Sequence, residues 1–526
     1  MPEQLRPGQK QPAVITQPSA QTPEAGNRWL ALAVLCTAVL IVNLDNTVLN
    51  VALPTLVRDL RATSSDLQWI VDAYIIVFAG LLLTAGSLAD RIGRKKTFLA
   101  GLAVFAAGSA AAAFSGGVSA LIAARAGMGV GGALLLPSTL SIISNMFRDP
   151  GERQRAIALW AATGGVGVAL GPIIGGLLLA RFWWGSVFLI NVPIAAVGLV
   201  AAILFVPDSK NPDVQAPDLP GAALSIAGIG SLLWAIIEAP TRGWSSPTVI
   251  GVFAASLVIL AAFAAWERRT THPMLNLGFF RQRSFSAGIP AVTTATFGLY
   301  GALFVLTQFF QFNVGYTPLQ TGIRILPAAG AVVVVAPASV PLVRAIGTKF
   351  TVAVGLAMIA AGLWQLSGAT VTTTFAGTVL GMALLGAGAG LTLPNASGSV
   401  IGSAPPSDSG VASATNSTAF QLGGALGVGV VGSLLNTRYQ NDMTAALAGQ
   451  HVPQAALAAI HGSFGGALAV AADAGGTVGR SLAHLAKTAF VSGMDLGLLA
   501  AVAAAIGGIL VVLVWLPARP GGEQAD

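Results

Sequence analysis

The chain has 526 residues, of which 54 % are hydrophobic and only 9 % are charged. Soluble proteins carry about a quarter charged residues, so this composition excludes a soluble domain and indicates a protein with many membrane-spanning helices. The formal net charge of +7 lies mostly in short connections, and we attribute it to membrane topology rather than to nucleic-acid binding. The single cysteine, Cys36, excludes an intramolecular disulfide framework. The four scattered histidines form no metal-ligand cluster, and we expect no metal and no cofactor.

Fourteen apolar stretches follow a Pro- and Gln-rich tail, residues 1–28, which we expect to be disordered. The first stretch lacks a convincing cleavage site, so we interpret it as a retained span rather than a signal peptide. The predicted spans are 29–53, 67–88, 97–114, 119–140, 156–180, 186–206, 221–238, 248–266, 285–313, 318–343, 350–367, 373–396, 408–436 and 491–516.

Three charged residues lie inside the predicted spans of the first half, namely Asp45, Asp72 and Arg125. A charge within the bilayer is costly, which makes each of them a functional hypothesis. At about 1.5 Å per residue, all three fall in the same half of the bilayer and could form a cluster. Two carboxylates beside one guanidinium would leave one acid free to exchange a proton or bind a cation. Structural roles remain open, most of all for Asp72, which lies near the interface.

Four cations crowd the connection between the second and third spans, residues 86–96. Lys and Arg accumulate in cytoplasmic loops, but this rule does not explain the two glycines and the aspartate beside them. The order Gly-x-Leu-Ala-Asp-Arg-x-Gly-Arg-Lys-Lys resembles the signature of this loop in the major facilitator superfamily. The resemblance implies a latch that holds the two halves of the protein together in one state. Its residues would be Gly86, Asp90, Arg91, Gly93 and Arg94.

The sequence 44–54 around Asp45 resembles the span-one signature of the fourteen-span drug:proton antiporters in that superfamily. Residues 125–132 match the Arg-x-x-Gln-Gly-x-Gly pattern of its fourth span, except that Met128 replaces the usual Gln. Residues 188–193, Phe-Leu-Ile-Asn-Val-Pro, also fit, although Gly185 replaces the Arg expected before them. The resemblance implies that Asp45 and Arg125 couple transport to protons, and Asp72 is a further candidate because a charge inside a span is costly.

Glycines repeat every fourth position in the fifth predicted span and make a flat face for close helix packing. The full pattern Gly-x-x-x-Gly-Pro-x-x-Gly-Gly resembles the antiporter motif that marks exporters in the superfamily. The residues of this motif are Gly167, Gly171, Pro172, Gly175 and Gly176.

The motif Ala-Asp-Arg-Ile-Gly-Arg-Lys at 89–95 has a degraded copy, Val-Arg-Ala-Ile-Gly-Thr-Lys, at 343–349. The copy lies where a duplicated six-span half would place it. We therefore predict an all-α polytopic fold with two six-helix halves, 29–206 and 285–516, separated by a linker and two inserted helices, 207–284.

Basic residues also predict the orientation. With the N-terminus in the cytoplasm, 18 of the 27 Lys and Arg residues fall on the inner side and seven on the outer side. Both tails, 1–28 and 517–526, would then be cytoplasmic. Residues 437–490 would form the largest outer loop, and the apolar stretch 455–472 within it is expected to lie along the surface.

The second half contains no acidic residue between Glu267 and Asp408. A substrate cavity there would be lined by amide and aromatic groups, which suits bulky amphipathic molecules. These residue types also occur in ordinary packing. The candidates are Phe304, Gln308, Gln311, Asn395 and Asn416.

These resemblances imply a proton-coupled exporter of lipophilic, often cationic compounds, acting as a monomer in the plasma membrane. Its partners would be small molecules, protons and the lipid bilayer, without nucleic acid. Two alternatives remain: an exporter of an endogenous metabolite or self-made antibiotic, and a polytopic membrane enzyme. The enzyme is disfavoured because no acidic or metal-binding loop motif is present.

The orientation can be tested by cysteine labelling after removal of Cys36. We expect Lys95→Cys to react with an impermeant reagent only in inverted vesicles, and Thr477→Cys to react in intact cells. Labelling of Lys95→Cys in intact cells would overturn the orientation.

Overall fold

The computed structural model describes residues 25–147, 149–208, 218–270, 273–275, 277–404 and 409–518, and these residues are almost entirely helical. The predicted tails lie largely outside the described residues. The helices of the first half are α1 (Ala25–Leu60), α2 (Ser64–Ile92), α3 (Arg94–Ala113), α4 (Val118–Met146), α5 (Pro150–Arg181), α6 (Ser186–Leu189) and α7 (Asn191–Phe205). The inserted pair is α8 (Leu219–Arg242) and α9 (Pro247–Arg269). The remaining helices are η1 (Leu277–Arg281), α10 (Arg283–Gln308), η2 (Phe309–Val314), α11 (Pro318–Ser367), α12 (Phe375–Ser403), α13 (Ser409–Ala446), α14 (Gln454–Gly462), α15 (Phe464–Ala474) and α16 (Gly476–Trp515).

Thirteen of the described helices are long and apolar enough to cross a membrane. One of them, α11, has 50 residues and is interrupted at Gly347, so it provides two spans and the total agrees with a fourteen-span protein. Large apolar side chains point outward from the bundle; Leu204, Val334 and Val514, for example, are 69 %, 73 % and 70 % exposed. Such a surface is stable in hydrocarbon, where apolar side chains need no burial in protein.

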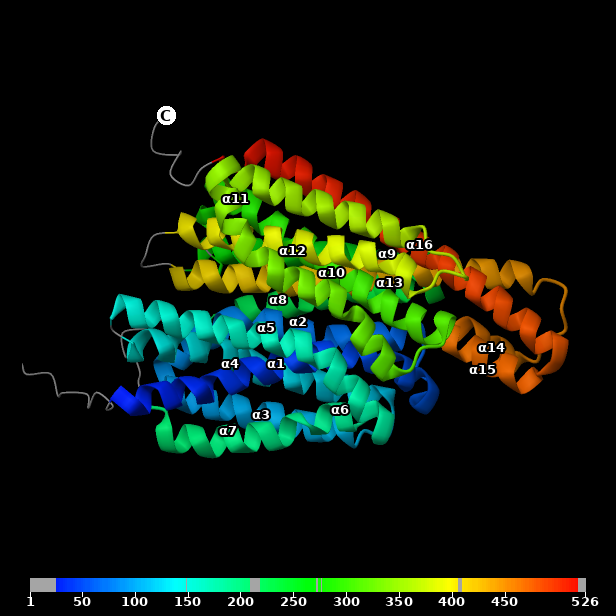
Figure 1. Ribbon diagram of the computed structural model, residues 1–526, viewed down its shortest axis with the longest axis horizontal. Coiled ribbons are helices and arrows are strands. Elements are labelled where there is room, and N and C mark those ends of the chain that lie inside the picture. Colours follow the sequence, from blue (N-terminus) through cyan, green and yellow to red (C-terminus); the bar gives the residue numbers. More distant parts are fainter. Residues whose placement is uncertain are drawn as a thin grey trace, which may run out of the picture.

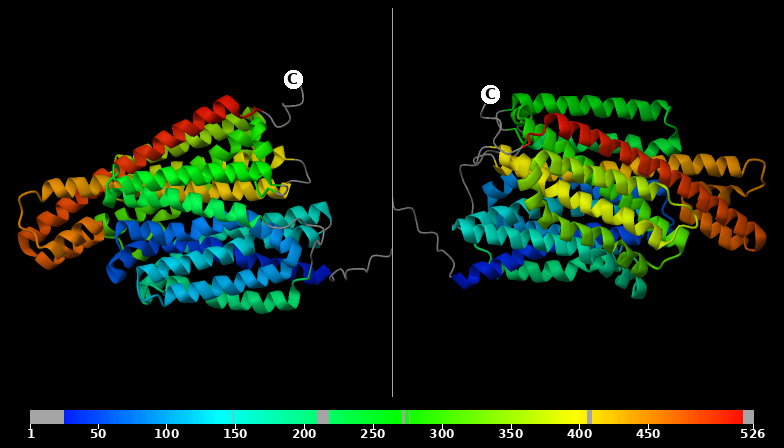
Figure 2. Two further views of the ribbon diagram at one scale, coloured as in Figure 1. Left: turned by 180° about the vertical axis from the view of Figure 1, so that it is seen from behind. Right: turned by 45° about the horizontal axis from the view of Figure 1, so that its top comes forward.

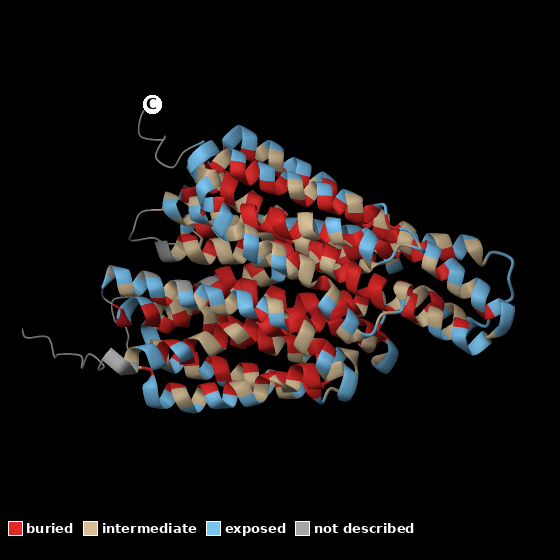
Figure 3. Cartoon of the chain, in the orientation of Figure 1, coloured by how far each residue is buried: buried red, intermediate tan, exposed pale blue. Residues whose placement is uncertain are grey.

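The helices form two bundles that lie side by side, α1–α7 in one and α10–α16 in the other (Figure 1). Buried residues concentrate inside and between the bundles, and exposed residues cover the outer faces (Figure 3). The inserted helix α8 packs against α2 and α13, one from each bundle, while α9 lies on its outer side (Figure 2). The insertion therefore covers one seam between the halves.

The repeated motif has the same backbone geometry in both halves. Gly93 separates α2 from α3 with φ 117°, and Gly347 interrupts α11 with φ 82°. Only glycine adopts such angles without strain. In both copies the hydroxyl of the threonine four residues later donates to the glycine carbonyl, at 3.0 Å from Thr97 and at 2.8 Å from Thr351. These glycines are thus needed for a sharp reversal between two spans, which explains a feature of the loop that charge does not.

The segment 437–490, which the sequence predicts as an outer loop, is largely helical and extends the bundle. Helices α13 and α16 continue beyond the bundle and are joined through α14 and α15 at the end opposite both described termini (Figure 1). The apolar residues pack inside this extension: Phe464 stacks on Phe490 with ring centres 4.4 Å apart, and the hydroxyl of Tyr439 donates to the carbonyl of Ile460 at 3.0 Å. We call this end of the molecule the hairpin end, and the opposite one the terminal end.

Candidate functional site

Asp45 of α1 and Arg125 of α4 form an ion pair inside the first bundle. The Nη1 atom of Arg125 contacts Oδ2 of Asp45, and both side chains are only 1 % exposed. The Nε atom of Arg125 donates to the carbonyl of Ile70 on α2 at 3.0 Å. Two buried charges at matching depth are thus paired and hydrogen bonded, as a low-dielectric environment requires.

Asn191, the first residue of α7, supplies the second partner of the aspartate. Its Nδ2 donates to Oδ1 of Asp45 at 3.0 Å and to the Ser109 hydroxyl on α3 at 3.4 Å. Each oxygen of Asp45 therefore has its own donor. Asn191 is fully buried. It is not among the site residues that the sequence predicts, although its place in the Phe-Leu-Ile-Asn-Val-Pro motif could have indicated its role. Ser109 lies in a run of small residues and offered none.

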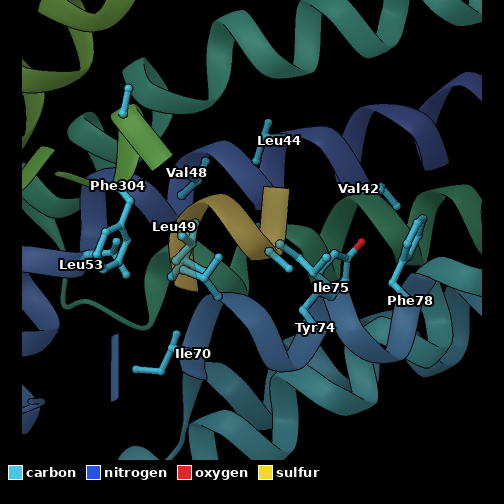
Figure 4. Close-up of a cluster of buried hydrophobic side chains, with 14 of the residues drawn as sticks. Val42, Leu44, Val48, Leu49, Leu53, Ile70, Tyr74, Ile75, Phe78 and Phe304 are labelled. Carbon is cyan, nitrogen blue, oxygen red and sulfur yellow. The ribbon is translucent and has the colours of Figure 1, made fainter. Parts of the chain in front are cut away.

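Aromatic rings enclose the guanidinium. The Cζ atom of Arg125 lies 4.5 Å from the ring centre of Tyr74 and 5.9 Å from that of Phe188. Tyr74 belongs to the buried cluster between α1 and α2 that Figure 4 shows together with Phe304 of the second bundle. The sulfur of Met128, at the position where the motif usually has Gln, lies 3.9 Å from Nη1 of Arg125. The departure from the motif thus replaces an amide neighbour by a soft, weak acceptor.

The structure does not bring Asp72 into this cluster. Asp72 makes no ion pair with Arg125; it is fully buried, and neither of its oxygens has a hydrogen-bond partner among the described residues. It lies on the side of α2 that faces α13, where a Cβ added to Gly429 would be 3.6 Å from its Oδ2. One turn earlier, Nε2 of Gln68 donates to the carbonyls of Val428 and Gly429 at 3.2 and 3.0 Å. Asp72 therefore lies at the contact between the halves, beside an amide that joins them.

The glycine motif of α5 packs against α1 around Asp45. A Cβ at Gly167 would lie 2.9 Å from the Leu40 carbonyl, and one at Gly171 would overlap the hydroxyl of Thr47. On the next turn, a Cβ at Gly175 would lie 3.1 Å from Val48. The glycine face therefore lets the two backbones approach closely on either side of the aspartate.

The same helix touches the second half. A Cβ at Gly176 would overlap the backbone of Leu319 at the start of α11, and one at Gly322 would overlap the carbonyl of Pro172. Helix α5 thus contacts the helix that carries Asp45 on one side and the opposite bundle on the other.

In the loop between α2 and α3, Arg91 is exposed and Nζ of Lys95 donates to the Ile203 carbonyl at 2.9 Å. Gly86 of α2 faces Pro137 of α4, and a Cβ added there would make an ordinary van der Waals contact at 3.7 Å. Arg94 has an interaction partner. The side chain of Asp90 lies outside the described residues.

The candidates in the second half divide into two groups. Gln308 and Gln311 are buried: Gln308 donates to Phe304 of its own helix at 3.2 Å, and Gln311 donates to the Val51 carbonyl of α1 at 2.8 Å. Gln311 thus joins the halves at the hairpin end. Phe304 is buried too, 2 % exposed.

Asn395 and Asn416 are partly exposed. Asn395 donates to the Leu391 carbonyl of its own helix at 2.7 Å, whereas Oδ1 of Asn416 has no partner among the described residues. Among the five candidates, Oδ1 of Asn416 and Oε1 of Gln311 are the buried acceptor atoms without a hydrogen-bond partner among the described residues.

The ion pair predicts an asymmetric response to substitution. Arg125→Leu leaves the Asp45 carboxylate buried without its charge partner, and we expect a loss of about 3–5 kcal/mol in stability. Adding Asp45→Asn should recover part of this loss, because the unpaired charge is then removed. Thermal unfolding in detergent measures both; equal midpoints for Arg125→Leu and the double variant would contradict the pairing.

Comparison with known proteins places these features in a family. The family model described as Major Facilitator Superfamily matches residues 35–428. The chain is 37 % identical over 481 residues to the multidrug efflux pump LfrA of Mycolicibacterium smegmatis, covering 91 % of this chain and 94 % of LfrA. It is 34 % identical to the tetracenomycin C resistance and export protein of Streptomyces glaucescens, covering 95 % of this chain and 94 % of the relative.

Solved structures agree on the fold. A bacterial homolog of the human lysosomal transporter Spinster, in an inward-facing and unoccupied conformation, superposes with a TM-score of 0.65 at 15 % identity, over 94 % of this chain and 98 % of that one. The peptide transporter POT in complex with sulfate gives a TM-score of 0.58 at 17 % identity, over 91 % and 95 % of the two chains. The family match spans most of both bundles and includes the ion pair and the glycine face of α5. The chain belongs to the major facilitator superfamily of membrane transporters.

Proposed function

We propose that this protein exports lipophilic, often cationic compounds across the plasma membrane in exchange for protons. The observation that carries the proposal is the buried Asp45–Arg125 pair, because a carboxylate with a displaceable cationic partner can alternate between a proton and an ion pair. Two relatives named for multidrug efflux and for antibiotic resistance and export support the direction and the substrate class.

The coupling follows from the contacts of Asp45. When a proton binds its carboxyl group, the guanidinium of Arg125 loses its counter-charge, and the donor from Asn191 meets a neutral group instead of an anion. This change is transmitted where α1 packs on the glycine face of α5, and α5 contacts α11 of the other half at Gly176. Protonation in the first bundle therefore biases how the two halves meet.

Gln68 and Gln311 join the two halves at the hairpin end, where they link α2 to α13 and η2 to α1. Opening of this end would expose Asp72, which lies beside Gln68. We propose Asp72 as the second protonatable group, one that gains water when the substrate leaves. In this scheme the terminal end faces the cytoplasm and both tails lie there.

The substrate would bind between the halves, near Asn416 and the paired rings of Tyr300 and Phe420, whose centres are 6.1 Å apart. The second half has no acidic residue between Glu267 and Asp408, so we expect neutral and singly charged compounds rather than dications.

Export of a self-made antibiotic is the second candidate. It is favoured by the similarity to the tetracenomycin C export protein over 95 % of this chain. The two functions share one mechanism and differ only in the compound carried.

The Asp45→Asn variant permanently mimics the protonated, neutral carboxyl group of Asp45 and cannot release a proton. We expect the variant to fold and to lose efflux driven by a pH gradient, down to the level of vesicles without the protein. Asp45→Glu should keep partial activity, because the acid remains although its reach changes. Efflux in inverted vesicles, at protein levels matched by blotting, measures this; full activity of Asp45→Asn would exclude Asp45 and leave Asp72 as the coupling group.

The latch gives a separate prediction. Asp90→Asn should reach the membrane at a normal level but transport more slowly, because one partner of a state-specific contact is lost. If the loop served only topology, the change would have little effect, since the charge rule counts Lys and Arg rather than Asp. Efflux rates of Asp90→Asn and wild type at equal expression separate the two; equal rates would refute the latch.

A further inference from the structure

Two acidic residues meet at the terminal end of the inserted pair, away from the ion pair of the first bundle. Asp218 immediately precedes α8, and Glu267 lies in the last turn of α9. They are 49 residues apart in sequence, yet both are buried, 8 % and 3 % exposed. Buried acids require partners, so the donors around each carboxyl group determine what this pair can do.

Asp218 is surrounded by N–H donors. Its Oδ1 accepts from the backbone N–H of Gly221 at 2.9 Å, as the cap of α8. The indole N–H of Trp266 on α9 lies 2.9 Å from Oδ1 and 3.1 Å from Oδ2. The carboxyl group of Asp218 thus has three hydrogen-bond contacts, which come from two N–H groups.

Glu267 has a different environment. Its Oε2 accepts from the backbone N–H of Leu275 at 2.9 Å, but its Oε1 has no partner among the described residues. This oxygen points toward Asp218: a Cβ added to Gly221 would lie 2.7 Å from Oε1 of Glu267 and would overlap Oδ2 of Asp218. The two oxygens converge on the space above this glycine.

Two carboxylates cannot hydrogen bond to each other unless one of them carries a proton. We propose that Asp218 and Glu267 bind one proton between them, held on Oε1 of Glu267 and donated to Oδ2 of Asp218. The assignment to Glu267 follows from the donors, since Asp218 already accepts from two N–H groups. The shared proton satisfies the one oxygen of the pair that has no donor.

No other described charge compensates the pair. Arg268 and Arg269, which follow Glu267 on α9, are exposed and form no ion pair within the part of the chain that the structure describes. At the start of α8, the group that faces Glu267 is Asp218. In the connection after α9, the group that faces Glu267 is the backbone N–H of Leu275. His272 of that connection lies outside the described residues, so the experiment must control for it.

The proton would hold three segments together: the start of α8, the end of α9 and the connection toward α10. That connection also reaches the first bundle, because the hydroxyl of Thr84 on α2 lies 3.8 Å from the sulfur of Met274. Losing the proton would leave two adjacent buried carboxylates and loosen this joint. The site does not depend on the proposed transport mechanism.

Infrared spectroscopy and thermal unfolding of the purified protein test the site. We expect a protonated-carboxyl band in the wild type that Glu267→Gln and Asp218→Asn both lose. The unfolding midpoint of the wild type should fall as the pH rises through neutrality, relative to Glu267→Gln, whose amide N–H replaces the proton permanently. Glu238→Gln, at the other end of α8, and His272→Gln are the matched controls and should keep both the band and the wild-type pH profile.

Parallel pH profiles of wild type and Glu267→Gln, or a band that persists in both Glu267→Gln and Asp218→Asn, would overturn the proposal. An unfolding midpoint that changes with added Mg²⁺ or Ca²⁺ and returns to its starting value with a chelator would also overturn the proposal. In that case the acid pair would bind a cation instead of a proton. If Glu267→Gln fails to fold, Asp218→Asn is judged by the same band. Efflux driven by a pH gradient, measured in Glu267→Gln, tests the transport mechanism separately.

Discussion

The ion pair between Asp45 and Arg125 is the constraint on which the first bundle depends. Moving two charges out of water costs several kcal/mol for each ion, and their attraction offsets this only when the remaining hydrogen-bonding atoms are satisfied. The surrounding helices provide those partners: α2 accepts through the Ile70 carbonyl and α7 donates through Asn191. The arrangement of α1, α2, α4 and α7 is therefore fixed around one carboxylate and one guanidinium.

Small residues make this arrangement possible. Packing at Gly167 and Gly171 lets α5 approach α1 on both sides of Asp45, and Gly176 of the same helix touches α11. In a bilayer the association of helices depends on such close packing, since lipid tails are as apolar as the side chains. One helix thus connects the charged site to the interface between the halves, which is the physical basis for coupling a protonation event to a change in how the halves meet.

The inserted pair α8–α9 is more than a spacer between the halves. Helix α8 packs on α2 and α13 near Asp72 and Gln68, and its first turn meets the end of α9 through Asp218 and Trp266. The inserted pair therefore contacts both bundles at one seam, and it contains a buried acid pair where α8 begins and α9 ends.

Much of this protein could be predicted from its sequence. Apolar runs of bilayer length determine the spans, because every backbone polar group must be satisfied within a helix in hydrocarbon. The expense of a buried charge singled out Asp45 and Arg125, and the repeated Gly93 and Gly347 revealed the duplicated halves. What the tertiary structure alone decided is which groups meet.

Asp72 shares the depth of the ion pair but points from another face of α2 toward α13, and depth along a helix does not specify the direction around it. Gln311 lies in a π-helix at 309–314 and donates to the Val51 carbonyl of α1, a contact between the halves that the sequence pattern did not predict. The segment 437–490 becomes an extension of two spans because its apolar residues pack against one another in three dimensions, a pairing that no local pattern records. Asp218 and Glu267 are brought together by the antiparallel return of α9 along α8, since contacts between residues far apart in sequence exist only once helices have packed.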